Sequence, residues 1–118
     1  MSSFQLNATG VHEIAYRVTS STVATIVDAS ETALFVPWFE VNETSNGTQD
    51  LTVDIYDGTN AVYLGDDAGV TWNAKSVNQY ASLKFTQGYL IPIGSKLRVT
   101  SSDAAGKFHV VGLVGKPY

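Results

Sequence analysis

The chain has 118 residues, of which 44% are hydrophobic and only 15% are charged, and its formal net charge is −4 at pH 7. This length suits one domain with a sizeable core, and so low a charge content argues against a disordered chain. The lack of cysteine excludes disulfides and thiolate metal sites, and the negative charge disfavours a nucleic-acid partner.

Residues 1–10 are expected to form an extended arm, with Phe4 and Leu6 as its apolar anchors, ahead of one domain over residues 11–118. The arm contains neither the basic segment nor the apolar run of a signal peptide. No later stretch is long enough to span a membrane. We therefore expect a protein made in the cytoplasm, whose arm either frays or docks on a neighbouring molecule.

The rest of the chain reads as short alternating segments separated by Gly, Asn, Asp and Ser, and no segment of ten residues has a helical period. The expected strands cover residues 11–18, 22–28, 34–41, 51–56, 61–64, 78–85, 89–93, 97–99 and 107–115, with a brief apolar segment at 70–72. This pattern predicts an all-β fold: a single antiparallel β-sandwich of eight to nine short strands, jelly-roll or immunoglobulin-like.

Residues 33–58 carry the clearest pattern in the chain. Leu51, Val53 and Ile55 alternate with polar residues, and Asn46-Gly47 lies in a polar turn before them. We expect a long hairpin here. Its first strand has two apolar faces. The expected core face is formed by Phe35, Phe39 and Val41, and the expected outer face by Leu34, Val36 and Trp38.

The outer face of that strand is the first candidate interface. Leu34, Val36 and Trp38, with Tyr56 as a polar-tipped neighbour, are expected to meet another molecule together with Phe4 and Leu6 of the arm. Residues 107–115 are also apolar on both faces, which predicts a central strand or one in an interface.

Charge is unevenly divided along the chain. Residues 1–67 hold ten acidic residues and one basic residue, and residues 68–118 hold one acidic and six basic residues, so the two parts carry −9 and +5. Either strands of the two parts interleave and mix these charges, or the folded protein is polarised and orients copies against one another.

We find no constellation typical of catalysis or metal binding. His12 and His109 are too few for a histidine-rich zinc site, and no nucleophile elbow or phosphate-binding glycine loop is present. Loop aspartates can bind calcium, but the order of residues in a calcium loop is missing around the aspartates Asp54, Asp57, Asp66 and Asp67. We expect a protein that is not an enzyme and has no cofactor or metal.

The aromatic residues offer an alternative of another class. Exposed rings on a β-sandwich can stack on sugars, although rings on strands more often serve packing or protein interfaces. A carbohydrate-binding module would use Tyr56, Trp72, Tyr80 and Tyr89.

From the central stretch onward the chain resembles small β-sandwich virion proteins of tailed bacteriophages. The resemblance spans residues 20–115 and rests on an ordered series of strand and turn motifs. These are Val41-Asn42, the turn 44–48, the strand 51–58 ending in Asp-Gly, Tyr63-Leu64, the aliphatic strand 89–93, Gly94 to Val99, and the apolar strand 108–114. Ser95 stands where the family usually has an aspartate.

The resemblance implies a structural role in a virus particle and transfers no catalytic residues. It favours a capsid decoration (cement) protein, with a neck, tail or fibre-attachment protein as the alternative. The implied partners are the major capsid protein or other virion proteins, together with further copies of the chain. A trimer is favoured because shells offer local three-fold sites.

Overall fold

Every regular element of the computed structural model is a β-strand, over the residues that it describes: 12–18, 23–44, 49–67, 75–77, 82–101 and 108–116. The eleven strands in these ranges are β1 (His12–Val18), β2 (Val23–Asp28), β3 (Leu34–Val36), β4 (Phe39–Glu43), β5 (Gln49–Tyr56), β6 (Ala61–Tyr63), β7 (Lys75–Val77), β8 (Ser82–Phe85), β9 (Tyr89–Ile91), β10 (Lys96–Ser101) and β11 (Phe108–Val114). All pairs are antiparallel, which confirms the expected all-β sandwich. The number exceeds the expected eight to nine because four strands have only three residues.

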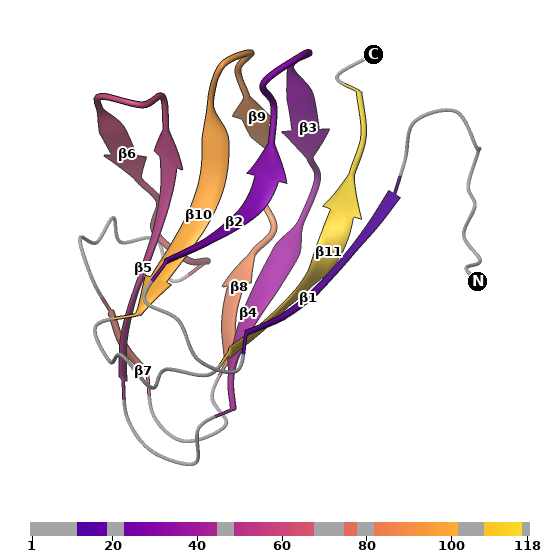
Figure 1. Ribbon diagram of the computed structural model, residues 1–118. Helices are drawn as coiled ribbons and strands as arrows, with labels where there is room; N and C mark the ends of the chain where they lie inside the picture. Colours follow the sequence, from indigo (N-terminus) through magenta and orange to yellow (C-terminus); the bar gives the residue numbers. More distant parts are fainter. Residues whose placement is uncertain are drawn as a thin grey trace.

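The strands form two main sheets and a short ribbon (Figure 1). The first sheet has the order β1-β11-β4-β8, and the second has the order β2-β10-β5-β6 with β7 also paired to β5. Early strands thus pair with late ones, β1 with β11 and β2 with β10, while β4 pairs with β8 and β5 with β6. This nested pairing is the topology of a jelly roll, one of the two expected arrangements.

The core lies between the two sheets, because both contribute side chains that are almost wholly buried. The first sheet supplies Phe39, Val41, Leu83, Phe85, Phe108 and Val110, and the second supplies Ala24, Val27, Leu51, Val53, Leu97 and Val99. Phe39 and Phe85, opposite one another on β4 and β8, stack with ring centroids 4.5 Å apart, and Tyr89 meets Phe39 edge-on at 5.5 Å. Rings in these geometries stabilise beyond their buried area.

The expected hairpin over residues 33–58 is wrong. β4 pairs with β11 and β8 in one sheet, and β5 pairs with β10, β6 and β7 in the other. β4 and β5 each have one apolar face. Because the chain passes from the first sheet to the second between them, both faces point into the same core. Asn46-Gly47 lies outside the described residues, as do the expected arm and the segment 70–72.

The assignment of faces in the segment before β4 is also wrong for Leu34, Phe35 and Val36. Phe35 bridges to Gly115 and Phe39 pairs with Gly112, so three residues lie opposite two and form a β-bulge at Pro37. The bulge shifts the alternation by one residue. Val36 therefore faces the core together with Phe39 and is fully buried.

The two halves of opposite charge interleave. Three directly opposed pairs join an acidic residue of the first half to a basic residue of the second: Glu40 with Lys84, Asp54 with Arg98, and Asp28 with Lys96. Opposite charges across a strand pair favour that register, so the uneven charge of the sequence serves strand pairing.

Candidate functional site

The ribbon of β3 and β9 lies at the end of the sandwich where β10 begins, between β10 and β11 (Figure 1). Its inner face is continuous with the core: Val36 and Ile91 are fully buried, and Leu34 and Tyr89 pack against the buried cluster. The loop after it is held in place, since the Gly94 N–H donates to the Ala29 carbonyl at 2.9 Å. Over the described residues, the ribbon is therefore anchored through its inner face.

The outer face of the ribbon is apolar. Phe35 and Leu90 are directly opposite one another, and the ring of Phe35 lies over Gly88, whose added Cβ would come within 2.8 Å of the ring. We call Phe35, Gly88 and Leu90 the ribbon patch. Leu90 is 52% exposed, and two more exposed apolar side chains, Trp38 and Ile93, lie two residues beyond the ends of β3 and β9.

Among the described residues, the structure separates those that the sequence suggested for an interface. Of the expected outer face only Trp38 is exposed, since Val36 is buried and Leu34 packs against the core. Tyr56 lies on β5, in the second sheet. Phe4 and Leu6 lie outside the described residues.

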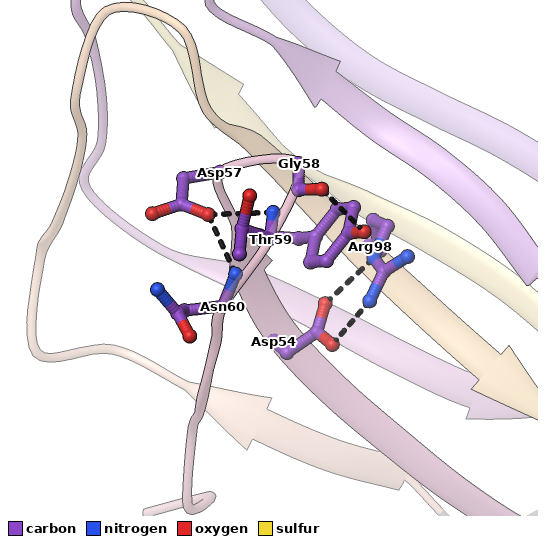
Figure 2. A network of polar contacts seen from close by, with 7 residues as sticks. Asp54, Asp57, Gly58, Thr59, Asn60 and Arg98 are labelled. Carbon is purple, nitrogen blue, oxygen red and sulfur yellow. Dashed lines mark hydrogen bonds and ion pairs between the residues drawn. The ribbon is translucent and has the colours of Figure 1, made fainter.

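The outer face of the second sheet carries a network of polar contacts (Figure 2). Arg98 donates from Nε and Nη2 to the two carboxylate oxygens of Asp54, at 3.0 and 2.7 Å, while its guanidinium carbon lies 3.8 Å from the centre of the Tyr56 ring. The hydrogen bond to Asp54 raises the pKa of Arg98 above its ordinary value. A bidentate, stacked arginine of this kind fixes the register of β5 and β10.

The turn after β5 continues this network. The Asp57 carboxylate accepts from the Thr59 and Asn60 N–H groups at 2.8 and 2.7 Å, and the Tyr56 hydroxyl donates to the Gly58 carbonyl at 2.9 Å. The backbone hydrogen bonds, that from Asn60 foremost, lower the pKa of Asp57 below its ordinary value of 3.8. The carboxylate therefore stabilises the turn above pH 3.8, and this contribution is lost as the pH falls through the lowered pKa.

We expect Arg98→Met to lower the free energy of unfolding by about 2 kcal/mol, because it leaves the Asp54 carboxylate, 4% exposed, without its charged partner. Arg98→Lys keeps the charge without the bidentate fork and should lie between Arg98→Met and the wild type. Urea denaturation gives both values. Equal stability of Arg98→Met and the wild type would contradict a stabilising role for the network.

Of the four aromatic side chains that a carbohydrate-binding module would use, two make contacts within the protein. Arg98 covers one face of Tyr56, and Tyr89 packs against Phe39 and Phe85. Burial raises the pKa of the Tyr89 hydroxyl, which accepts a hydrogen bond from the Gln87 N–H. Trp72 and Tyr80 lie outside the described residues.

In the described part of the chain, no group of three or more His, Asp or Glu residues is placed to hold a metal ion. The same residues include no helix long and apolar enough to cross a membrane.

Sequence reasoning missed Leu90, although a signal was present. Pro92 follows directly on the strand that contains Leu90 and cannot occupy a central ladder position, which indicates a short edge strand. Leu90 alternates with Tyr89 and Ile91, so it lies on the opposite face of that strand from them. Phe35, which is half-buried, was missed because its place opposite Leu90 depends on the bulge at Pro37.

Comparison with protein-family models finds no match, and neither does comparison with curated protein sequences. Two solved structures, each of a pentameric capsid protein isolated from metagenomic phage sequences, are similar at 18% identity. The match to the first structure has a TM-score of 0.48 and covers 88% of this chain and 61% of that protein. The match to the second has a TM-score of 0.46 and covers 88% of this chain and 67% of that protein. The chain thus spans about three fifths of the first of these proteins.

Proposed function

We propose that this protein is a structural component of a tailed-bacteriophage virion, where it decorates the capsid and stabilises the shell through protein contacts. The partner is the major capsid protein or another virion protein. The protein is made in the host cytoplasm and acts as a homo-oligomer, with a trimer at local three-fold sites of the shell as the first arrangement to test. A neck, tail or fibre-attachment position would use the same surfaces at another copy number.

Two independent features support a virion role. The order of strand and turn motifs over residues 20–115 resembles phage β-sandwich virion proteins. The jelly-roll topology occurs in viral capsid proteins, although lectin domains share it, so the fold by itself is an analogy.

The observation that carries the proposal is the apolar outer face of the ribbon. Leu90, Trp38 and Ile93 are 52%, 37% and 63% exposed and lie on or beside one ribbon whose other face is fixed in the core. Aromatic and aliphatic side chains on a rigid element are typical anchors of protein interfaces. Repetition of one such contact over a shell multiplies its strength by avidity.

Cosedimentation with capsids purified from the phage that carries the gene tests this role. We expect wild-type protein to bind and Leu90→Glu to lose at least about tenfold in apparent affinity, because the carboxylate must be desolvated at the contact. Trp38→Ala should also weaken binding, through lost apolar area.

Val62→Glu is the matched control, since Val62 is 62% exposed but lies on β6 and outside the ribbon patch. It should bind as the wild type does. No cosedimentation of the wild-type protein would contradict the decoration role. Binding of Leu90→Glu equal to that of the wild type, or an equal loss in the Val62→Glu control, would contradict the ribbon as the capsid contact. Light scattering of the purified protein separately tests the oligomer.

A further inference from the structure

The strand β1 lies at the edge of the first sheet (Figure 1), where it pairs with β11 over all seven of its residues without a register shift. No described residue pairs with its other edge. A sheet edge of this kind presents backbone N–H and C=O groups that another strand can pair with.

Over the described residues, the other edges of the two main sheets are blunted in ways that β1 is not. The edge of β8 is covered, because the Asp67 N–H donates to the Lys84 carbonyl at 2.7 Å. β2 pairs with β10 through a register shift, and β6 and β7 have three residues each. Short strands, bulges and covering loops are the usual means of preventing edge pairing, so the long regular edge of β1 stands apart among the described strands.

The sequence of β1, HEIAYRV, is complementary to a second copy of itself that runs in the opposite direction. If two copies pair antiparallel about a two-fold axis at Ala15, Glu13 of each copy is opposite Arg17 of the other, and Ile14 is opposite Tyr16. All seven residues overlap in this register. Opposite charges and aromatic–aliphatic pairs at directly opposed positions both stabilise antiparallel strands.

Neighbouring registers lack this match. Centres at Ile14 or Tyr16 pair each charged residue with an uncharged one, and centres at Glu13 or Arg17 place like charges against each other. The register of greatest overlap is therefore also the one in which the charges pair. A two-fold contact of this kind is isologous, since one strand supplies both halves.

We propose that a second copy of this chain pairs with the edge of β1 that no described residue occupies, which joins the two four-stranded sheets into one continuous sheet across the two-fold axis. This contact is separate from the ribbon patch and goes beyond the proposed decoration role. It links two chains directly, or two larger oligomers when the chains are already associated elsewhere. The number of chains per particle in solution is then even, and trimers of the kind proposed above would pair into hexamers.

Light scattering over a concentration series tests the pairing with charge reversals. Glu13→Arg places arginine at both positions 13 and 17, and Arg17→Glu places glutamate at both, so each variant should raise the dissociation constant at least about tenfold and halve the molar mass. Mixing the two variants makes complementary edges again, and so does the double variant Glu13→Arg/Arg17→Glu. Both should restore the wild-type mass.

Ala15→Glu, which sets two glutamates against each other at the two-fold axis, should halve the mass as well, while Thr25→Glu on the exposed side of β2 should leave it unchanged. Circular dichroism checks that each variant is folded. An odd number of chains in wild-type particles, a wild-type monomer, or single variants with unchanged mass would overturn the pairing. Capsid binding through the ribbon patch is scored separately and does not depend on this result.

Discussion

Replacing Phe39 with alanine is expected to lower the free energy of unfolding by about 3–5 kcal/mol. Phe39 is fully buried on β4, stacks on Phe85 at 4.5 Å and meets Tyr89 edge-on, so truncation removes a ring contact on two sides and leaves a cavity between the sheets. Domains of this size have a total stability of about 5–15 kcal/mol, so the variant should lose a large fraction of that stability.

Urea denaturation followed by circular dichroism measures the effect. Phe39→Leu keeps most of the apolar volume and should cost less than half as much. Leu90→Ala, at an exposed position on the ribbon, should change stability by no more than about 0.5 kcal/mol. A loss below about 1 kcal/mol in Phe39→Ala would contradict the position of Phe39 at the centre of the core.

Gly112→Ala is expected to destabilise the protein by about 3 kcal/mol or more, at the upper end of the usual cost of overpacking. A Cβ on Gly112 would come within 2.5 Å of the Trp38 carbonyl oxygen and within 2.9 Å of the Phe39 Cα. Both are backbone atoms of the neighbouring strand segment, so they cannot yield as the end of a flexible side chain can. The pairing of β11 with β4 beside the bulge must open instead.

Gly58→Ala separates crowding from backbone strain. Gly58 has φ +98°, which an alanine adopts at a cost of about 1–2 kcal/mol, but a Cβ there meets nothing within 4 Å. Gly112→Ala should therefore be the more damaging change in thermal and urea unfolding. The reverse order would show that β11 and β4 are not in such close contact at Gly112.

The sequence predicted which faces are buried better than which strands are neighbours. The alternation of Leu51 and Val53 identified the core face of β5, and the apolar character of β11 on both faces identified a central strand. Periodicity carries no information on pairing partners, and for this reason β4 and β5 were wrongly joined in a hairpin. The charges did carry information on pairing, since Asp54 and Arg98 lie opposite one another on β5 and β10.

The candidate surface was harder to predict because it depends on a local irregularity. A strand running without interruption from Leu34 to Val41 would place Val36 outside, whereas the bulge at Pro37 turns it into the core and turns Phe35 outward. A proline within an expected strand is a signal of such a break. Of the three residues that the sequence places on the outer face of that strand, Leu34, Val36 and Trp38, only Trp38 is exposed.

The position of β11 between β1 and β4 makes the first sheet depend on contacts between the two ends of the chain. Val18 is paired with Phe108 and Val23 with Thr100, so each sheet joins segments from opposite ends of the chain. Contacts of such long range make folding slow, because a large loop must close before they form. A nascent chain that has not yet released β11 from the ribosome lacks the central strand of its first sheet and exposes the apolar faces of β4 and β8.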